Sequence, residues 1–200
     1  MKKIEIAPAI YLYEDVFEPG DIISLVNQEC SESWGYVGWA KTEVGSRNTV
    51  RDDYRSAMGC NMRPLAIDPS AVAVERIIPL VTAWREIVLA VQDAIHDYRA
   101  DHILELEKDE GFTVLKYGRG AQYKGHVDHA PQNQRILSLS GFLNDDYSGG
   151  ELVFPLFDVK VKPKTGSILL FPSNFPYYHY VEPVGIDDER IRYSFVTWLS

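Results

Sequence analysis

Short apolar runs separated by turn signals fill the second half of the chain. Glycine-rich turns such as residues 118–120 and 148–150 divide this half into eight expected strands. These are residues 112–117, 123–127, 135–143, 151–154, 159–161, 167–171, 177–181 and 191–199. The pair Gly149-Gly150 predicts a close approach or a bulge before the fourth of them.

The first half has a mixed pattern. Residues 9–13 and Trp34–Trp39 are expected as strands, and Ile22–Cys30 has the apolar spacing of a helix. The longest helical stretch opens at residues 68–70 and extends to Ile95, where Pro79 is expected to kink or split it.

A helical block followed by eight short strands predicts a mainly β fold with α-helices, a double-stranded β-helix (jelly roll) supported by N-terminal helices. The chain has no internal repeat and no low-complexity linker, so we expect one domain over residues 1–200. In this interpretation residues 1–111 form a helical and strand support region and residues 112–200 form the barrel core, where we expect any site to lie.

Composition narrows the class of protein. The chain has 200 residues, 46% hydrophobic and 24% charged, which suffices to bury a core without disulfides. Its net charge of −9 disfavours sequence-independent nucleic-acid binding, and no apolar run approaches the ~20 residues of a membrane span. Cys30 and Cys60 lack metal-clip spacing and are interpreted as buried hydrophobes. With no secretion signal at the N-terminus, a cytoplasmic location is expected.

Candidate chemistry begins with His126 and Asp128, which share a face if the strand continues through both. His179 on a later strand offers a third ligand. Two imidazoles and one carboxylate leave coordination positions open, which suits non-haem Fe(II). A His-x-Asp spacing also occurs by chance, and a zinc hydrolase would use the same three side chains. His129, which would face the other way, is expected at the rim.

Arg192 and Ser194 share a face of the last expected strand. A buried guanidinium with a neighbouring hydroxyl can bind a carboxylate in bidentate fashion, and 2-oxoglutarate supplies one. The alternative is an ion pair between Arg192 and a structural acid. Tyr117 and Tyr123 offer phenols for a carboxylate or for the substrate entrance, although tyrosines on strands usually only pack.

The polar segment Gly45–Arg55 is expected as a loop. Arg55 in it is a candidate substrate-binding residue, for a substrate that carries a carboxylate. The alternative is that the arginines of this loop are solvated.

The stretch Tyr117–Trp198 resembles the prolyl 4-hydroxylase-like family of 2-oxoglutarate- and Fe(II)-dependent dioxygenases. The matching segments are Tyr117-Gly118, Tyr123 to Asp128, Arg135, Phe142-Leu143-Asn144, Gly149 to Pro155, Pro163, Gly166-Ser167, Phe171-Pro172, His179 to Val184, Arg192-Tyr193-Ser194 and Trp198. The resemblance implies iron on His126, Asp128 and His179, and 2-oxoglutarate held by Arg192 with help from Tyr117. It further implies O₂ as co-substrate, with ascorbate as a candidate reductant.

Two positions depart from the family. The gap between His179 and Arg192 is longer, because an acidic loop is inserted, and Phe142 stands where relatives often have a tyrosine that binds 2-oxoglutarate.

The resemblance implies hydroxylation of a C–H bond in a prolyl or other residue of a peptide or protein. A free amino acid or other small molecule is the alternative substrate. A nucleic-acid dealkylase is disfavoured, because Trp198 occupies the place of that family's second arginine. A ligand-binding barrel without activity would lack one of the metal ligands. The oligomeric state cannot be read from the sequence.

Overall fold

The computed structural model describes residues 1–31, 37–44, 49–63, 74–185 and 189–200, and its main feature is a pair of antiparallel sheets. The larger sheet has the spatial order β1 (Lys2–Ala7), β2 (Ile10–Glu14), β12 (Ile168–Pro172), β9 (Leu137–Phe142), β14 (Arg192–Leu199), β7 (Thr113–Tyr117), β6 (Met58–Asn61) and β3 (Ala40–Lys41).

The smaller sheet has the order β11 (Val159–Val161), β10 (Leu152–Phe154), β13 (His179–Val181) and β8 (Tyr123–His126). A short hairpin of β4 (Glu43–Val44) and β5 (Thr49–Val50) stands apart. The two main sheets share one apolar cluster, to which Tyr117 and Leu169 contribute from the larger sheet and Phe154 and Val181 from the smaller. The mainly β jelly-roll fold expected from the pattern is therefore present.

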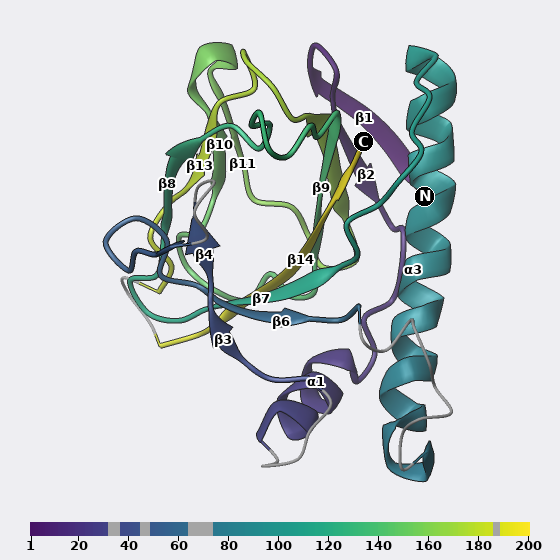
Figure 1. Ribbon diagram of the computed structural model, residues 1–200, viewed down its shortest axis with the longest axis vertical. Helices are drawn as coiled ribbons and strands as arrows, with labels where there is room; N and C mark the ends of the chain where they lie inside the picture. Colours follow the sequence, from purple (N-terminus) through teal and green to yellow (C-terminus); the bar gives the residue numbers. More distant parts are fainter. Residues whose placement is uncertain (32–36, 45–48, 64–73, 186–188) are drawn as a thin grey trace.

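Within the described residues, two helices lie on the far side of the larger sheet. These are α1 (Ile22–Ser31) and α3 (Val74–His102), and Figure 1 shows α3 along one side of this sheet and the smaller sheet on the other. Trp84 of α3 and Val26 of α1 share a buried cluster with Leu137 and Phe195 of the sheet. Neither helix has the length and apolar composition to cross a bilayer, within the part of the chain described.

The eight expected strands of the second half are all present, with ends shifted by one or two residues at most. A 3₁₀ turn, η1 (Pro155–Phe157), joins β10 to β11. The close approach expected at Gly149-Gly150 is confirmed, because both residues have positive φ and a Cβ on Gly149 would lie 2.2 Å from the Pro183 carbonyl oxygen.

Predictions for the first half were less accurate. The strand β1 was not expected, because its lysines and glutamate make the segment look like a polar terminus, although charged residues are common on edge strands. The strand expected at Trp34–Trp39 is wrong over residues 37–39, and its residues 34–36 lie outside the described ranges. Within the expected loop 45–55, residues 49 and 50 form β5.

The helix predicted at Ile22–Cys30 is confirmed as α1. The opening expected at residues 68–70 lies outside the described ranges. Pro79 does not split α3, which is one continuous helix. A proline removes a single backbone donor, and the apolar packing of α3 against the sheet outweighs that loss.

Alternation along the central strands positions the site. On β14, Arg192 and Ser194 face the smaller sheet, whereas Tyr193 and Phe195 lie in the cluster shared with the helices. Successive strand residues point to opposite faces, so one strand supplies both layers. The same alternation on β9 turns Ser138 and Ser140 toward the smaller sheet and places Leu137 in the helix-side cluster.

Candidate metal and cosubstrate site

The two candidate histidines come from adjacent strands. β8 and β13 pair antiparallel, and His126 and His179 are direct partners in their register. Asp128 lies two residues beyond the end of β8, so the expected continuation of the strand does not hold. Backbone bonds from Asp128 and His129 to the Ser173 carbonyl, 3.0 and 2.9 Å long, instead hold this segment against the neighbouring chain.

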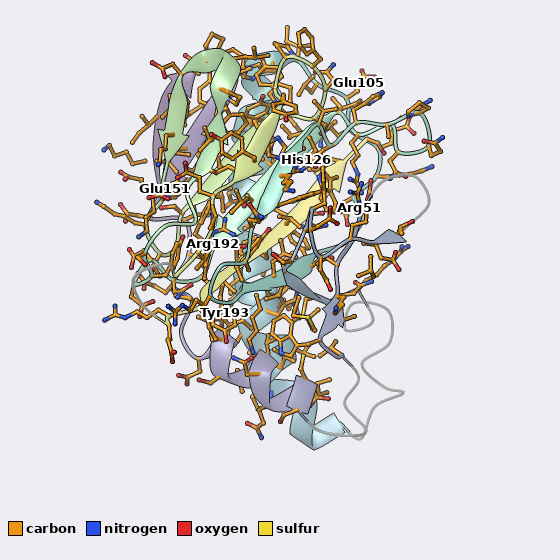
Figure 2. All side chains as sticks on the ribbon, turned by 90° about the vertical axis from the view of Figure 1, so that its left-hand side faces the viewer. Arg51, Glu105, His126, Glu151, Arg192 and Tyr193 are labelled. Carbon is orange, nitrogen blue, oxygen red and sulfur yellow. The ribbon has the colours of Figure 1, made fainter. Side chains whose placement is uncertain are left out.

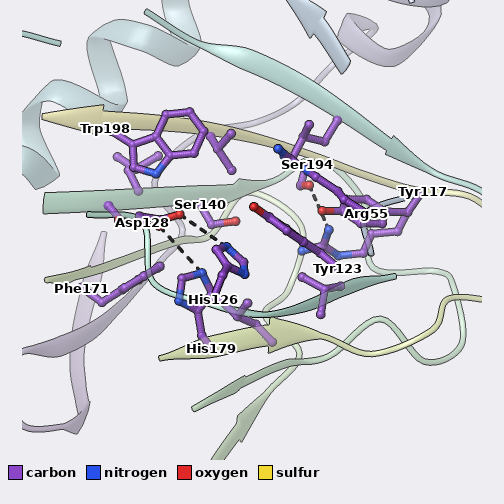
Figure 3. A pocket seen from close by; sticks show the side chains of 17 residues that line it. Arg55, Tyr117, Tyr123, His126, Asp128, Ser140, Phe171, His179, Ser194 and Trp198 are labelled. Atoms are coloured by element: carbon purple, nitrogen blue, oxygen red, sulfur yellow. Dashed lines mark hydrogen bonds and ion pairs between the residues drawn. The ribbon is translucent and has the colours of Figure 1, made fainter. Parts of the chain in front are cut away.

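The three side chains converge on one point. Their nearest ligand atoms all lie within 4.8 Å of one another. Nε2 of His126 lies 3.4 Å from one carboxylate oxygen of Asp128, and Nε2 of His179 lies 3.8 Å from the other. The dashed lines in Figure 3 mark these two contacts. Ligand atoms ~2.1 Å from one metal in adjacent positions are about 3 Å apart, so the spacing fits one ion.

Backbone carbonyls fix the tautomer of both imidazoles. Nδ1 of His126 lies 2.9 Å from the Lys124 carbonyl oxygen, and Nδ1 of His179 lies 3.0 Å from that of Tyr177. A carbonyl only accepts, so each Nδ1 donates a proton, and in the neutral form of each ring Nε2 keeps its lone pair. Both lone pairs are then available for a metal, which is the arrangement typical of metal-binding histidines.

The metal end of the pocket has a buried, negatively charged carboxylate, that of Asp128. Burial alone would raise the pKa of Asp128, but His179, His126 and the Ser138 hydroxyl hold it below its ordinary range. The Ser138 hydroxyl donates to Asp128 over 2.7 Å. Burial, together with repulsion from His126, lowers the pKa of His179 to about 4, so this ring is neutral near pH 7. Neutral imidazoles and an ionised carboxylate are the protonation states that bind a metal.

The donor set therefore fits a divalent ion. Two imidazole nitrogens and one carboxylate oxygen on one side, with free space opposite, match the facial arrangement of non-haem Fe(II) sites. The pocket beside them has roughly 460 Å³ of free space, part of which is open to solvent. That space leaves room for further ligands of the metal.

Arg192 lies in the same pocket and is 1% exposed. Its Nη1 donates to Ser194 Oγ over 3.0 Å, while its buried Nε has no acceptor. No carboxylate in the described ranges pairs with it, so the alternative of a structural ion pair is not supported there. An unpaired buried guanidinium is costly, and an anionic ligand would remove that cost.

Aromatic rings surround this cation. The rings of Tyr117 and Phe142 lie 4.8 and 5.3 Å from its guanidinium carbon. A Cβ on Gly150 would lie 2.7 Å from the Val184 side chain, 3.0 Å from that of Arg192 and 3.2 Å from the Tyr147 ring, so the glycine lets these three side chains approach one another. Figure 2 shows His126 and Arg192 toward the middle of the molecule, on strands of different sheets.

Tyr123 and Arg55 form a stack on the metal side. The Tyr123 ring lies 3.7 Å from the His126 ring, centre to centre, and the Arg55 guanidinium carbon lies 4.4 Å above Tyr123. Arg55 is 9% exposed, so the solvated alternative is wrong for this arginine. Arg51 in the same segment is exposed and pairs with Asp53 over 2.9 Å.

The histidine and the cysteines that were not expected to bind metal are not part of the cluster of three candidate ligands. His129 is exposed, and its Nδ1 lies 3.0 Å from the Arg135 carbonyl oxygen. The two cysteines are free; Cys60 is buried, and its sulfur lies 3.4 Å from that of half-buried Cys30.

Sequence reasoning missed Ser138 and Tyr147, and it named Trp198 without placing it in the pocket. Ser138 holds Asp128, Trp198 lines the pocket, and Tyr147 packs beside Arg192. The strand alternation of β9 and β14 was a signal for Ser138 and Trp198, since Ser138 shares a face with Phe142, and Trp198 with Arg192.

A family model described as "2OG-Fe(II) oxygenase superfamily" matches residues 112–200. Two curated proteins of Arabidopsis thaliana are similar over 89 aligned residues. "Probable prolyl 4-hydroxylase 9" is 36% identical, covering 34% of this chain and 31% of the relative. "Prolyl 4-hydroxylase 13" is 30% identical, covering 34% and 32%. The match thus spans about a third of the length of each curated relative.

Solved structures share the fold over nearly the whole chain. A Trichoplax adhaerens prolyl hydroxylase, in complex with a peptide fragment of the hypoxia inducible factor oxygen degradation domain, has a TM-score of 0.70 at 18% identity and covers 96% of this chain and 83% of that one. A Pseudomonas putida prolyl-4-hydroxylase has a TM-score of 0.60 at 22% identity, with coverage of 96% and 92%. The viral collagen prolyl hydroxylase of Paramecium Bursaria Chlorella virus-1, in a 2OG complex, has a TM-score of 0.61 at 15% identity and covers 98% of both chains.

Proposed function

We propose that this chain, a prolyl 4-hydroxylase-like 2-oxoglutarate/Fe(II) oxygenase by matched sequence and fold, hydroxylates a prolyl residue of a peptide or protein. The observation that supports this most strongly is that one pocket contains both a set of candidate metal ligands and a buried cation without a carboxylate partner in the described part of the chain. One end has three metal ligands, and the other has a buried cation with no carboxylate partner among the described residues. A metal ion bound to the three ligands could chelate one end of a dicarboxylate, while the buried cation binds the other end.

His126, Asp128 and His179 would hold Fe(II), and Arg192 with Ser194 would bind the distal carboxylate of 2-oxoglutarate. The chemistry supplied by the bound groups is oxidative decarboxylation: O₂ gives one oxygen atom to succinate and one to the substrate carbon, with release of CO₂. Tyr117 lines the space between the two ends and is assigned to the cosubstrate.

The protein's own task is positioning and exclusion of water. Tyr123 fixes the His126 ring by stacking, and Ser138 fixes the carboxylate of Asp128. Apolar side chains of Leu115, Leu152 and Val181 line the pocket, which keeps water from the reacting carbon. We also propose that α1 and α3 act as the support of the larger sheet, on the basis of the cluster they share with it.

The test is mass spectrometry of proline-containing peptides after incubation with the protein, Fe(II), 2-oxoglutarate, O₂ and ascorbate. A gain of one oxygen atom on proline, matched by succinate, supports the proposal. Succinate formation that no peptide stimulates, but that a free amino acid does, would move the substrate to the small-molecule alternative. Absence of succinate under all these conditions overturns the proposal.

A further inference from the structure

Arg55 is a second buried cation at the pocket, apart from Arg192. It lines the inner pocket with the metal ligands, and it also lines an outer cavity bounded by Ala130, Asn133 and Trp198. One aromatic ring, that of Tyr123, separates its guanidinium from His126. Arg55 therefore lies where the inner pocket and the outer cavity meet, beside His126 and Asp128, which also line both, and a substrate would enter there.

The hydrogen bonding of Arg55 is incomplete. Its Nη1 donates to the Glu43 carbonyl oxygen over 3.3 Å, and its buried Nε has no acceptor. Arg135, which lines the same outer cavity, shows the contrast. That side chain donates to both carboxylate oxygens of Glu110, over 2.6 and 2.5 Å, and lies over the Trp198 ring. Arg135 is satisfied within the protein, whereas Arg55 keeps donors for a ligand.

The sum of charges in the site with Fe(II) and 2-oxoglutarate bound also indicates that Arg55 has a positive charge available for a ligand. A ferrous ion and Arg192 together balance Asp128 and the two carboxylates of 2-oxoglutarate. Arg55 then adds one positive charge that no described carboxylate neutralises. The net charge of −9 does not oppose this locally, because charges beyond ~8 Å are largely screened at physiological salt.

We propose that Arg55 binds a carboxylate of the substrate, so that the preferred substrate has an acidic group next to the hydroxylated residue. The group is an Asp or Glu side chain or the carboxylate of a chain end. This inference rests on the proposed oxygenase function and adds its substrate class. A guanidinium fork binds a carboxylate through two parallel bonds, and the free Nε edge of Arg55 is suited to that geometry.

The experiment compares three proline peptides that differ only at the residue after proline. The first has Glu with an amidated end, the second has Gln with an amidated end, and the third ends at proline with a free carboxylate. For the wild-type protein we expect about tenfold higher kcat/KM on a carboxylate peptide than on the Gln peptide, as for one charge-assisted hydrogen-bonded contact. The first and third peptides show which source of the carboxylate is used.

Arg55→Gln should lower kcat/KM on the carboxylate peptides by about tenfold more than on the Gln peptide, which removes the preference, and Arg55→Lys should restore part of it. Arg51→Gln is the matched control, an exposed arginine of the same segment, and should keep the full preference. A readout without turnover is calorimetric binding of the same peptides to the protein loaded with Mn(II) and 2-oxoglutarate without O₂. The same preference should appear there.

Equal loss on all three peptides, or a raised KM for 2-oxoglutarate in substrate-free succinate formation, overturns the inference. So does a wild-type protein that forms succinate but shows no preference for a carboxylate peptide. Failure of the proposed function differs from these outcomes, because the wild-type protein would then form no succinate at all.

Discussion

The two faces of the larger sheet are built from alternating residues of the same strands, yet they have opposite character. On β14 the pocket face presents Arg192 and Ser194, and the helix face presents Phe195, which contacts the rings of Trp84 and Phe112 at 5.4 and 5.9 Å. The difference indicates that stability depends on the helix face and chemistry on the pocket face. Substitutions one to three residues apart should then separate the two properties.

The largest effect is expected on the helix face. Phe195→Ala removes a fully buried ring and should lower the free energy of unfolding by about 3–5 kcal/mol. Denaturant unfolding measures it. The KM for 2-oxoglutarate, determined at a temperature where the variant is folded, should stay at the wild-type value. A large rise in that KM would show that the two faces are not separable.

On the pocket face, Arg192→Gln should raise the KM for 2-oxoglutarate by about 100-fold, because a buried charge pair with the cosubstrate is lost. Stability should not fall, since the guanidinium has no carboxylate partner among the described residues of the folded protein. Steady-state succinate formation and a thermal melt give the two readouts. Arg190→Gln, an exposed position two residues away, is the control.

The smallest of the three effects is expected at Ser138. Ser138→Ala removes the hydroxyl that donates to Asp128, and loss of one such outer contact should weaken iron binding by about tenfold. Anaerobic Fe(II) titration measures the affinity. Ser167→Ala, which removes a buried hydroxyl with no partner, should bind iron as the wild type does. Equal weakening in both variants would argue against a specific role for Ser138.

The barrel and its ligands were predictable because their signals are local. Short strands bounded by glycine turns fixed the positions of His126, His179 and Arg192 to within a residue or two of a strand end. The resemblance then implied which of these side chains act together. The pairing of His126 with His179 in register explains why residues so far apart in sequence meet.

What the sequence left open depends on long-range packing. Strand β1 pairs with β2 and has several charged residues. Its hydrophobic pattern alone does not distinguish such an edge strand from a polar tail. The burial of Arg55 arises from its stack on Tyr123 and from an antiparallel bridge between these two residues, which are 68 positions apart in the sequence. The cytoplasmic location and the division of the chain at residue 111 stay predictions.

The central claim is that one pocket holds a metal on three ligands and a dicarboxylate on Arg192 together. The most direct measurement is anaerobic equilibrium binding of 2-oxoglutarate to the wild-type protein and to His179→Ala, each with and without Fe(II), and with His129→Ala as the control. The account predicts that iron strengthens binding in the wild type and in His129→Ala but has no effect in His179→Ala. Binding that is equally tight without iron, or equally enhanced in all three proteins, would contradict it.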